Sequence, residues 1–504
     1  MRMPLEIPPG IASDDTTFAT SRWSAGDNVR PWQNKMQVIG GWIDALSGDT
    51  LTGVCRNILG LGKTSGGAII AFGTHSALQV YQAGVLYDIT PAALAAGSIN
   101  AGGAAGGWGR GTWSSGAWSS SSGTYYIRTW SLSAYGAYLI ANPRGGGIYE
   151  WQGDTSADAV IITNAPTTVT YVLATPQRQV LAFGCNEEVS ATFNPLCIRG
   201  SDIEDNTDWT TTATNNAFEH ILDASGGRIV AAKLIGPYVA VWTDHSLYLG
   251  EYIGDPSQTY RFDRVGDNCG LAGPNAVEVV DSTAFWLSPD LQFRTWTIGG
   301  RVELVVPPIG KDFRDNLERG QIDKVAASAL SQFGEVWWHY PDSRDGIENS
   351  RYLAVSMLDG SWFGGTLART ATVNAGVLQY PVKATYAGMA YYHEYGTSAD
   401  GAALTWSLTT SDIYIGTAES WAECRGIWPD FEAQEGSVAL TVNLKPYPQG
   451  TARTKGPYAL AVSADKKDFL LQGRVATFTF SGSAIGAFMR IGKPVLDVVL
   501  TGRQ

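Results

Sequence analysis

The sequence predicts a mainly β protein: an irregular β-propeller of six or seven blades with insertions, followed by a C-terminal β-sandwich. The 504-residue chain has 59 glycines and 18 tryptophans but only 16% charged residues, which suits short strands and tight turns. Five times, an apolar run is followed by a short polar turn and an aromatic-rich run, the signature of a β-hairpin. Repetition of such hairpins at intervals of tens of residues is typical of propellers.

Residues 1–45 are predicted to form an extended strap. Four prolines exclude the interior of a helix, namely Pro4, Pro8, Pro9 and Pro31. The segment also carries Trp23 and Trp32, which a short arm cannot bury alone. We therefore expect the strap to lie across a neighbouring domain or subunit.

Residues 46–400 contain the predicted propeller. The hairpin sequences cover 69–81, 138–151, 238–249, 284–296 and 333–342 with its continuation 351–362. Apolar positions that anchor the repeats are Phe72, Leu139, Leu181, Val241, Phe285, Val336 and Ala390. They lie about 40 to 70 residues apart, so seven anchors allow six or seven blades.

One helix is predicted within this region, at residues 309–320. Phe313 and Leu317 share one face of it, and Gly320 is suited to end it.

A Gly/Ser/Ala-rich insertion at 91–124 interrupts the hairpins. Trp108, Trp113 and Trp118 recur in it at every fifth position. Flexible linkers rarely carry regularly spaced tryptophans. We therefore predict that these indoles, together with Trp23 and Trp32, contribute to a subunit interface.

Residues 401–504 are predicted to form the β-sandwich. Runs such as SVALTVNL and RVATFTF alternate apolar and polar residues, as expected for strands with one buried face.

The charge and the cysteines exclude several classes of protein. A formal net charge of −12, with Lys466-Lys467 as the one adjacent basic pair, argues against a protein that grips nucleic-acid phosphates. Five scattered cysteines without a C-x-x-C pair predict buried free thiols and assembly in a reducing cytoplasm. No segment approaches the roughly 18 apolar residues of a membrane span, so none is expected.

The loop 201–209 is the most acidic cluster. Asp202, Glu204, Asp205 and Asp208 supply oxygen ligands of the kind that calcium prefers. Their spacing is not that of an EF-hand, and a solvated turn is the alternative interpretation. We expect no metal, with these four residues as the weak candidates, and no cofactor.

Catalysis would need two carboxylates across a cleft, as in glycosidases. Glu335 and Glu394 lie beside aromatic residues, but carboxylates also occupy strand ends in propellers. No G-x-S-x-G motif is present. We predict no catalytic residue and no enzyme activity.

The sequence motifs, taken in order, resemble a phage structural family, the tail nozzle proteins (tubular B-type or hub proteins) of short-tailed phages, or podoviruses. The matching motifs are DNVRPW, IGGW, LYDITP, RTWSLSAYGAYLIANPRGGGIYEW, IRGSDIEDNTDWTTTATN, VAVWTDHSLYLGEYIG, DNCGLAGPNAV, EVWWHYPD, RYLAVSMLDGSW, YYHEYGT and MRIGKPVLDV. They span nearly the whole chain.

The resemblance implies a homo-oligomeric ring, commonly a hexamer, below the portal and adaptor in the virion tail, assembled in the host cytoplasm. Such a ring retains the genome, conducts double-stranded DNA during ejection without binding specific sequences, and offers docking surface to tail fibres or spikes. Two alternatives remain open: a propeller glycan hydrolase, or a carbohydrate-binding protein, acting on host-surface polysaccharide.

Overall fold

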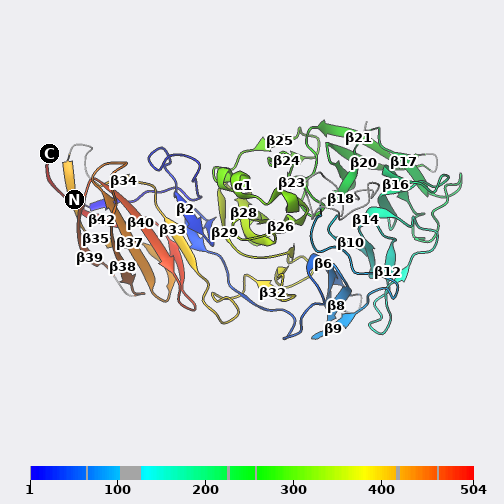
Figure 1. The fold of residues 1–504 in the computed structure, drawn as a ribbon, viewed down its shortest axis with the longest axis horizontal. Coiled ribbons are helices and arrows are strands. Elements are labelled where there is room, and N and C mark those ends of the chain that lie inside the picture. The colour runs from blue at the N-terminus through cyan, green and yellow to red at the C-terminus, as the bar shows by residue number, and fades with distance from the viewer. Residues whose placement is uncertain are drawn as a thin grey trace, which may run out of the picture.

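The structure, a computed structural model, describes residues 2–63, 66–102, 126–223, 227–255, 258–415, 420–462 and 465–503. It is mainly β, with 51% strand and 3% helix. Within the described residues the strands form ten antiparallel sheets. Figure 1 shows an elongated molecule with sheets of the C-terminal region at one end, where both termini also lie, and the sheets of the middle region at the other.

Seven four-stranded sheets follow one another along the chain. The first three consist of β6 (Cys55–Gly62), β7 (Ala68–Thr74), β8 (Leu78–Gln82) and β9 (Val85–Asp88); β10 (Trp130–Tyr135), β11 (Tyr138–Pro143), β12 (Tyr149–Trp151) and β13 (Val160–Ile161); and β14 (Val169–Ala174), β15 (Val180–Asn186), β16 (Phe193–Gly200) and β17 (Phe218–Ile221). The next three consist of β18 (Ile229–Ile235), β19 (Tyr238–Thr243), β20 (Ser246–Asp255) and β21 (Gln258–Asp267); β22 (Val277–Val280), β23 (Thr283–Leu287), β24 (Phe293–Thr297) and β25 (Glu303–Val305); and β26 (Ala326–Leu330), β27 (Glu335–Pro341), β28 (Asn349–Ser356) and β29 (Trp362–Thr366). The seventh consists of β30 (Ala371–Val373), β31 (Val382–Ala384), β32 (Ala390–His393) and the N-terminal β5 (Trp42–Asp44).

The first strands of the seven sheets contact one another in a closed cycle. β6 contacts β10, and the contacts continue through β14, β18, β22, β26 and β30, which returns to β6. Figure 1 shows several of these strands gathered around a common centre. The anchor positions predicted from the sequence fall one to a sheet, six in the second strand and Ala390 in the third strand of the last sheet.

The N-terminal strap completes the seventh sheet. β5 pairs with β32 through Trp42–His393, Ile43–Tyr392 and Asp44–Tyr391. The last sheet of the cycle therefore combines three strands from residues 371–393 with one strand from the N-terminal strap. Backbone hydrogen bonds between β5 and β32 hold the two parts together.

Buried tryptophans join neighbouring sheets. The Trp130 indole donates to the carbonyl of Thr74 in the preceding sheet (2.7 Å). The Trp338 indole donates to the carbonyl of Ala276, the residue directly before β22 (3.2 Å). Trp242 and Trp286 pack edge to face at 5.7 Å between the fourth and fifth sheets. Since each sheet packs on both sides, its second strand is buried along almost its whole length, as in β15 and β27.

The remaining three sheets combine the strap with the C-terminal region. One sheet has the strand order β1 (Arg2–Pro4), β42 (Val495–Arg503), β35 (Ser420–Trp428) and β39 (Lys467–Gly473). The six-stranded sheet has the order β2 (Ala25–Asp27), β33 (Trp406–Thr409), β40 (Val475–Gly482), β37 (Val438–Lys445) and β38 (Arg453–Leu460), and β34 (Ile413–Tyr414) also pairs with β40. The third has the order β3 (Val29–Trp32), β4 (Lys35–Val38), β41 (Phe488–Ile491) and β36 (Phe431–Glu435). Alternate residues of β37 and β40 are buried in one hydrophobic core.

The helix predicted at 309–320 is shorter than expected. Helix α1 covers Gly310–Asn316, and a 3-10 segment, η1, covers Arg319–Lys324. Leu317 leaves the helix with an extended backbone (ψ 129°) and forms a bridge with Asp342, directly after β27. Phe313 and Leu317 are both buried, as their shared face predicts.

We predict that Gly41→Ala destabilises the closure at β5. The Gly41 amide donates to the carbonyl of Gly396 (2.8 Å), and a Cβ at Gly41 would lie 2.2 Å from the Ser398 carbonyl oxygen. We expect the free energy of unfolding to fall by about 1–3 kcal/mol, measured by denaturant titration.

Gly62→Ala is the matched control for this variant. The one atom within 4 Å of its Cβ would be a Val377 methyl carbon at 3.9 Å. A change within about 0.5 kcal/mol is expected there. Equal losses in the two variants would contradict the role assigned to Gly41.

Candidate functional site

The strap meets the sixth and seventh sheets at a buried arginine. Arg30 of β3 has 0% of its surface exposed, and its Nη2 donates to Oε1 of Glu394, directly after β32. Its Nε lies 3.5 Å from Oε1 of Glu335, the first residue of β27. One guanidinium therefore connects three segments that are far apart in the sequence.

Both carboxylates have further partners inside the protein. The Trp337 indole donates to Oε2 of Glu335 at 2.8 Å, and the Gly40 amide donates to Oε2 of Glu394 at 3.0 Å. Burial raises the pKa of Glu335 to about 7, although the charge of Arg30 acts in the opposite direction. The backbone of the strap and the side chains of the two sheets thus hold the pair in place.

A second group of buried bases continues this cluster. Lys383, 3% exposed, places Nζ 3.9 Å from the Trp337 ring and 3.2 Å from Nε2 of His339. Burial lowers the pKa of Lys383 to about 7 and the pKa of His339 well below its ordinary value. Arg369 donates to Nε2 of His393 at 2.9 Å. The result is a polar network enclosed between two sheets.

This arrangement brings together the two carboxylates considered for glycoside hydrolysis, and their side chains are only 0% and 6% exposed. Glu335 and Glu394 share a guanidinium, whereas a glycosidase pair faces a substrate. Cavities of 540, 670, 490 and 170 Å³ occur elsewhere in the described residues, and neither glutamate lines them. The geometry is that of a buried cluster in which one guanidinium lies between two carboxyl groups.

The four acidic residues of loop 201–209 are not brought together around a common point. Three of them accept backbone N–H groups nearby: Asp202 from Ile203 and Asn216, Asp205 from Thr207, and Asp208 from Thr210. Glu204 adopts a left-handed backbone conformation, with φ of 60°. Among the described residues, no group of three or more His, Cys, Asp or Glu side chains is arranged to hold a metal ion.

The predicted interface tryptophans fall into three situations. Trp108, Trp113 and Trp118 lie outside the described residues. Trp23 is 2% exposed and packs against Phe480, so very little of its indole is available to another subunit. Trp32 is half-buried, with its ring centroid 5.1 Å from that of Phe333.

A small polar cavity of 170 Å³ lies at the centre of the cycle of sheets. Residues from the first strands or the segments directly beside them line it, including Arg56, Tyr171, Lys233 and Glu278. Lys233 Nζ lies 3.7 Å from Glu278 Oε2 within this lining. The cavity has the volume of a few water molecules.

Comparison of the chain with protein-family models finds no match, and comparison with curated protein sequences finds no significant match.

In the described part of the chain, no helix is long and apolar enough to cross a membrane. All five cysteines are buried and unpaired.

Sequence reasoning selected Glu335 and Glu394 by their aromatic neighbours but missed their partners. Arg30, Arg369 and Lys383 come from three separate segments, and nothing in their local sequence indicates a common site. Arg30 lies within DNVRPW, one of the motifs that carry the family resemblance.

We predict a pH-dependent effect of Glu335→Gln. Between its ordinary pKa of 4.5 and about 7, Glu335 is protonated in the folded protein but ionised in the unfolded chain. The free energy of unfolding of the wild type therefore falls as pH rises through this window. The variant lacks this group, so relative to wild type it should gain up to about 3 kcal/mol between pH 4.5 and 7.5.

Denaturant titrations at both pH values measure this gain, with Glu303→Gln at an exposed position as control. A difference between wild type and Glu335→Gln that stays the same at both pH values would contradict the assignment.

Proposed function

We propose that this chain is a structural virion protein, one wall segment of the tail nozzle ring of a short-tailed phage. In this proposal the seven cyclically arranged sheets are the blades of a β-propeller, and the C-terminal sheets form the β-sandwich. The ordered resemblance of the sequence motifs supports the family, and the closed cycle of first strands supports the architecture.

The observation that carries the proposal is the shared N-terminal strap. β1 to β4 belong to the C-terminal sheets, whereas β5 completes the seventh sheet of the other region. Two domains joined by a single linker usually move relative to each other. A strap that supplies strands to both regions restricts their relative motion. This rigidity suits a subunit of a tail ring that carries mechanical force better than an enzyme whose domains open and close.

The central cavity supports a lumen built from several chains. A volume of 170 Å³ cannot admit DNA, whose major groove alone is about 12 Å wide. DNA would therefore pass between subunits of a ring, which cyclic symmetry closes with one repeated interface. A net charge of −12 favours passage of DNA through the ring without binding to it, because acidic channel walls repel the phosphates of the DNA.

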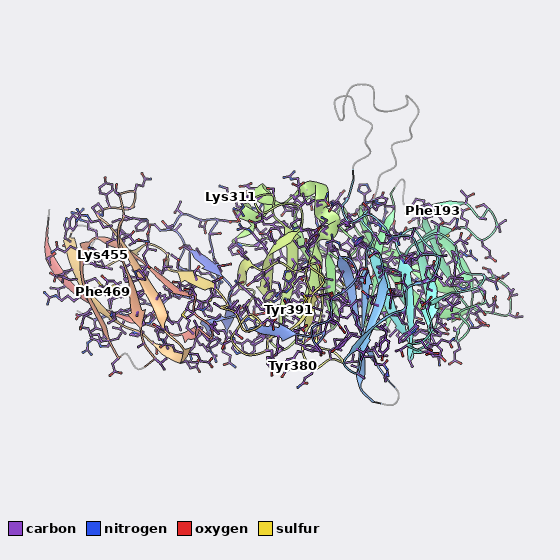
Figure 2. The ribbon with its side chains drawn as sticks, turned by 60° about the horizontal axis from the view of Figure 1, so that its bottom comes forward. Phe193, Lys311, Tyr380, Tyr391, Lys455 and Phe469 are labelled. Carbon is purple, nitrogen blue, oxygen red and sulfur yellow. The ribbon has the colours of Figure 1, made fainter. Side chains whose placement is uncertain are left out.

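One observation favours the carbohydrate-binding alternative. A cavity of 670 Å³ between the first and seventh sheets is lined by Tyr81, Tyr380, Tyr392 and Tyr395. Aromatic faces with polar hydroxyls suit sugar rings. Figure 2 shows Tyr380 on the side of the molecule opposite Lys311.

Ring formation tests the proposal. Mass photometry and negative-stain imaging of the full-length chain, alone and mixed with the adaptor ring, should show closed rings of about six chains. Replacement of Trp108, Trp113 and Trp118 together by Ser should reduce the ring fraction at least severalfold, because aromatic anchors dominate such interfaces.

A monomer under both conditions that binds or cleaves capsular polysaccharide would contradict the nozzle assignment and support the alternative.

A further inference from the structure

A pocket of 540 Å³ lies where the strap, helix α1 and the sixth sheet meet. This volume falls in the usual range of ligand sites, about 300–1,000 Å³. The residues important here are Ile11 and Asp27 of the strap, Ile309 and Asp315 of the helical region, and Tyr352 and Leu353 of β28.

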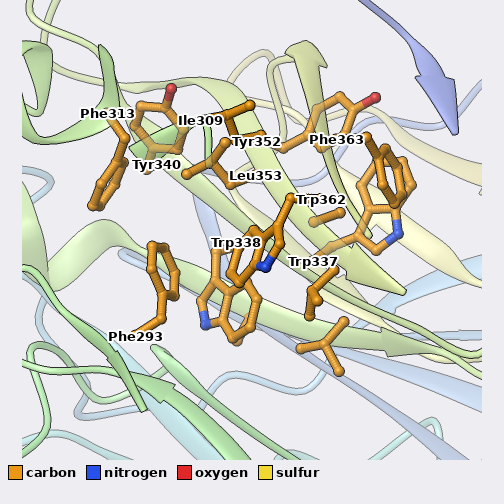
Figure 3. Packing of buried hydrophobic residues seen from close by; sticks show 14 of the residues in the cluster. Phe293, Ile309, Phe313, Trp337, Trp338, Tyr340, Tyr352, Leu353, Trp362 and Phe363 are labelled. Carbon is orange, nitrogen blue, oxygen red and sulfur yellow. The ribbon is translucent and has the colours of Figure 1, made fainter. Parts of the chain in front are cut away.

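The floor of the pocket is apolar with hydroxyl groups beside it. Ile11, Ile309 and Leu353 are buried side chains that line it. In Figure 3, Ile309 and Leu353 lie between the rings of Tyr340 and Tyr352, and the hydroxyl oxygens of both tyrosines point to the same side. An aliphatic chain could therefore pack on this floor and reach polar groups.

Two polar groups in the pocket have unused hydrogen-bonding capacity. Oδ1 of Asp27 accepts the Thr366 amide at 2.6 Å, and the Thr366 side chain is a further hydrogen-bond partner of this carboxylate. A carboxylate has about four acceptor sites, so acceptor capacity remains. Tyr352 is 1% exposed, and its hydroxyl has no hydrogen-bond partner in the described part of the chain. Buried hydroxyls without partners are rare in folded proteins, so this one needs an explanation.

The other charged groups around the pocket are engaged or solvated. Asp14 accepts the Lys311 amide at 2.9 Å, and Asp312 accepts from Arg344 at 2.8 Å. Arg351 is paired with Asp345 at 2.8 Å and with Asp342 at 3.3 Å. Its charge also acts on Asp27, whose pKa is raised by burial. Asp315 and the Lys311 side chain are exposed and carry opposite charges. Among the described carboxylates that line the pocket, Asp27 is thus the one that lies on the strap inside it and keeps acceptor capacity.

We infer that this pocket binds a primary alkylammonium group, with the aliphatic stem on Ile309 and Leu353 and the ammonium between Asp27 Oδ2 and the Tyr352 hydroxyl. An ammonium is a compact charge with three donors, which matches two separate acceptors. A guanidinium prefers two parallel acceptors on one carboxylate, and Oδ1 of Asp27 is already occupied. The ammonium group comes either from a lysine side chain of a neighbouring protein or from a free amine. The assignment to a neighbouring protein rests on the proposed role in the virion tail.

Binding of two probes to the full-length chain tests this inference: Nα-acetyl-lysine methylamide and pentylamine, by isothermal titration at pH 7. Asp27→Asn keeps the acceptor for Thr366 and should weaken both probes about tenfold or more. Tyr352→Phe should weaken them severalfold without lowering the free energy of unfolding, because its hydroxyl has no partner to lose. Asp315→Asn, which changes an exposed charge of the same pocket, should change affinity less than twofold.

Each outcome has a defined meaning. Tighter binding of the lysine derivative assigns the pocket to a protein partner, and tighter binding of pentylamine assigns it to a free amine. Absence of binding, equal losses in Asp27→Asn and Asp315→Asn, or tighter binding of pentylguanidine would overturn the inference. Ring formation is a separate readout, so a failed nozzle assignment and a failed pocket assignment are distinguishable.

Discussion

The fold depends on a single buried guanidinium held between two carboxylates. Arg30 comes from the strap, Glu335 from the sixth sheet and Glu394 from the end of the seventh. Removal of one member of a buried ion pair costs about 3–5 kcal/mol, because the remaining charge stays buried without compensation. The packing of the strap and the packing of the sixth and seventh sheets therefore stabilise each other.

From this point the strap extends in both directions. Its earlier residues supply strands to the C-terminal sheets, and ten residues after Arg30 the Gly40 amide binds Glu394. β5 follows directly and completes the seventh sheet. Consistent with this, one continuous hydrophobic core contains Trp23 and Phe480 of the C-terminal sheets together with Trp242 and Trp338 of the cyclic sheets. The two regions form one mechanical unit.

Much of the strand content was predictable because local patterns reflect local packing. The alternation in β37 and β40 follows from one buried face, and the hairpin sequences at 69–81 or 238–249 lie in paired strands. β35 and β39 were missed, since charged residues interrupt SWAECRGIW and KDFLLQG. The pairing of β5 with β32 joins residues almost 350 positions apart, and no local pattern signals it. For the same reason sequence reasoning found two glutamates but not the arginine between them.

Calorimetric unfolding of wild type and Arg30→Met tests the central claim that the strap makes the two regions one unit. The account predicts a single cooperative transition for the wild type, with coincident changes in near- and far-ultraviolet circular dichroism. The variant should unfold at lower temperature and separate into two transitions. Two independent transitions in the wild type, or an unchanged profile in the variant, would contradict the account.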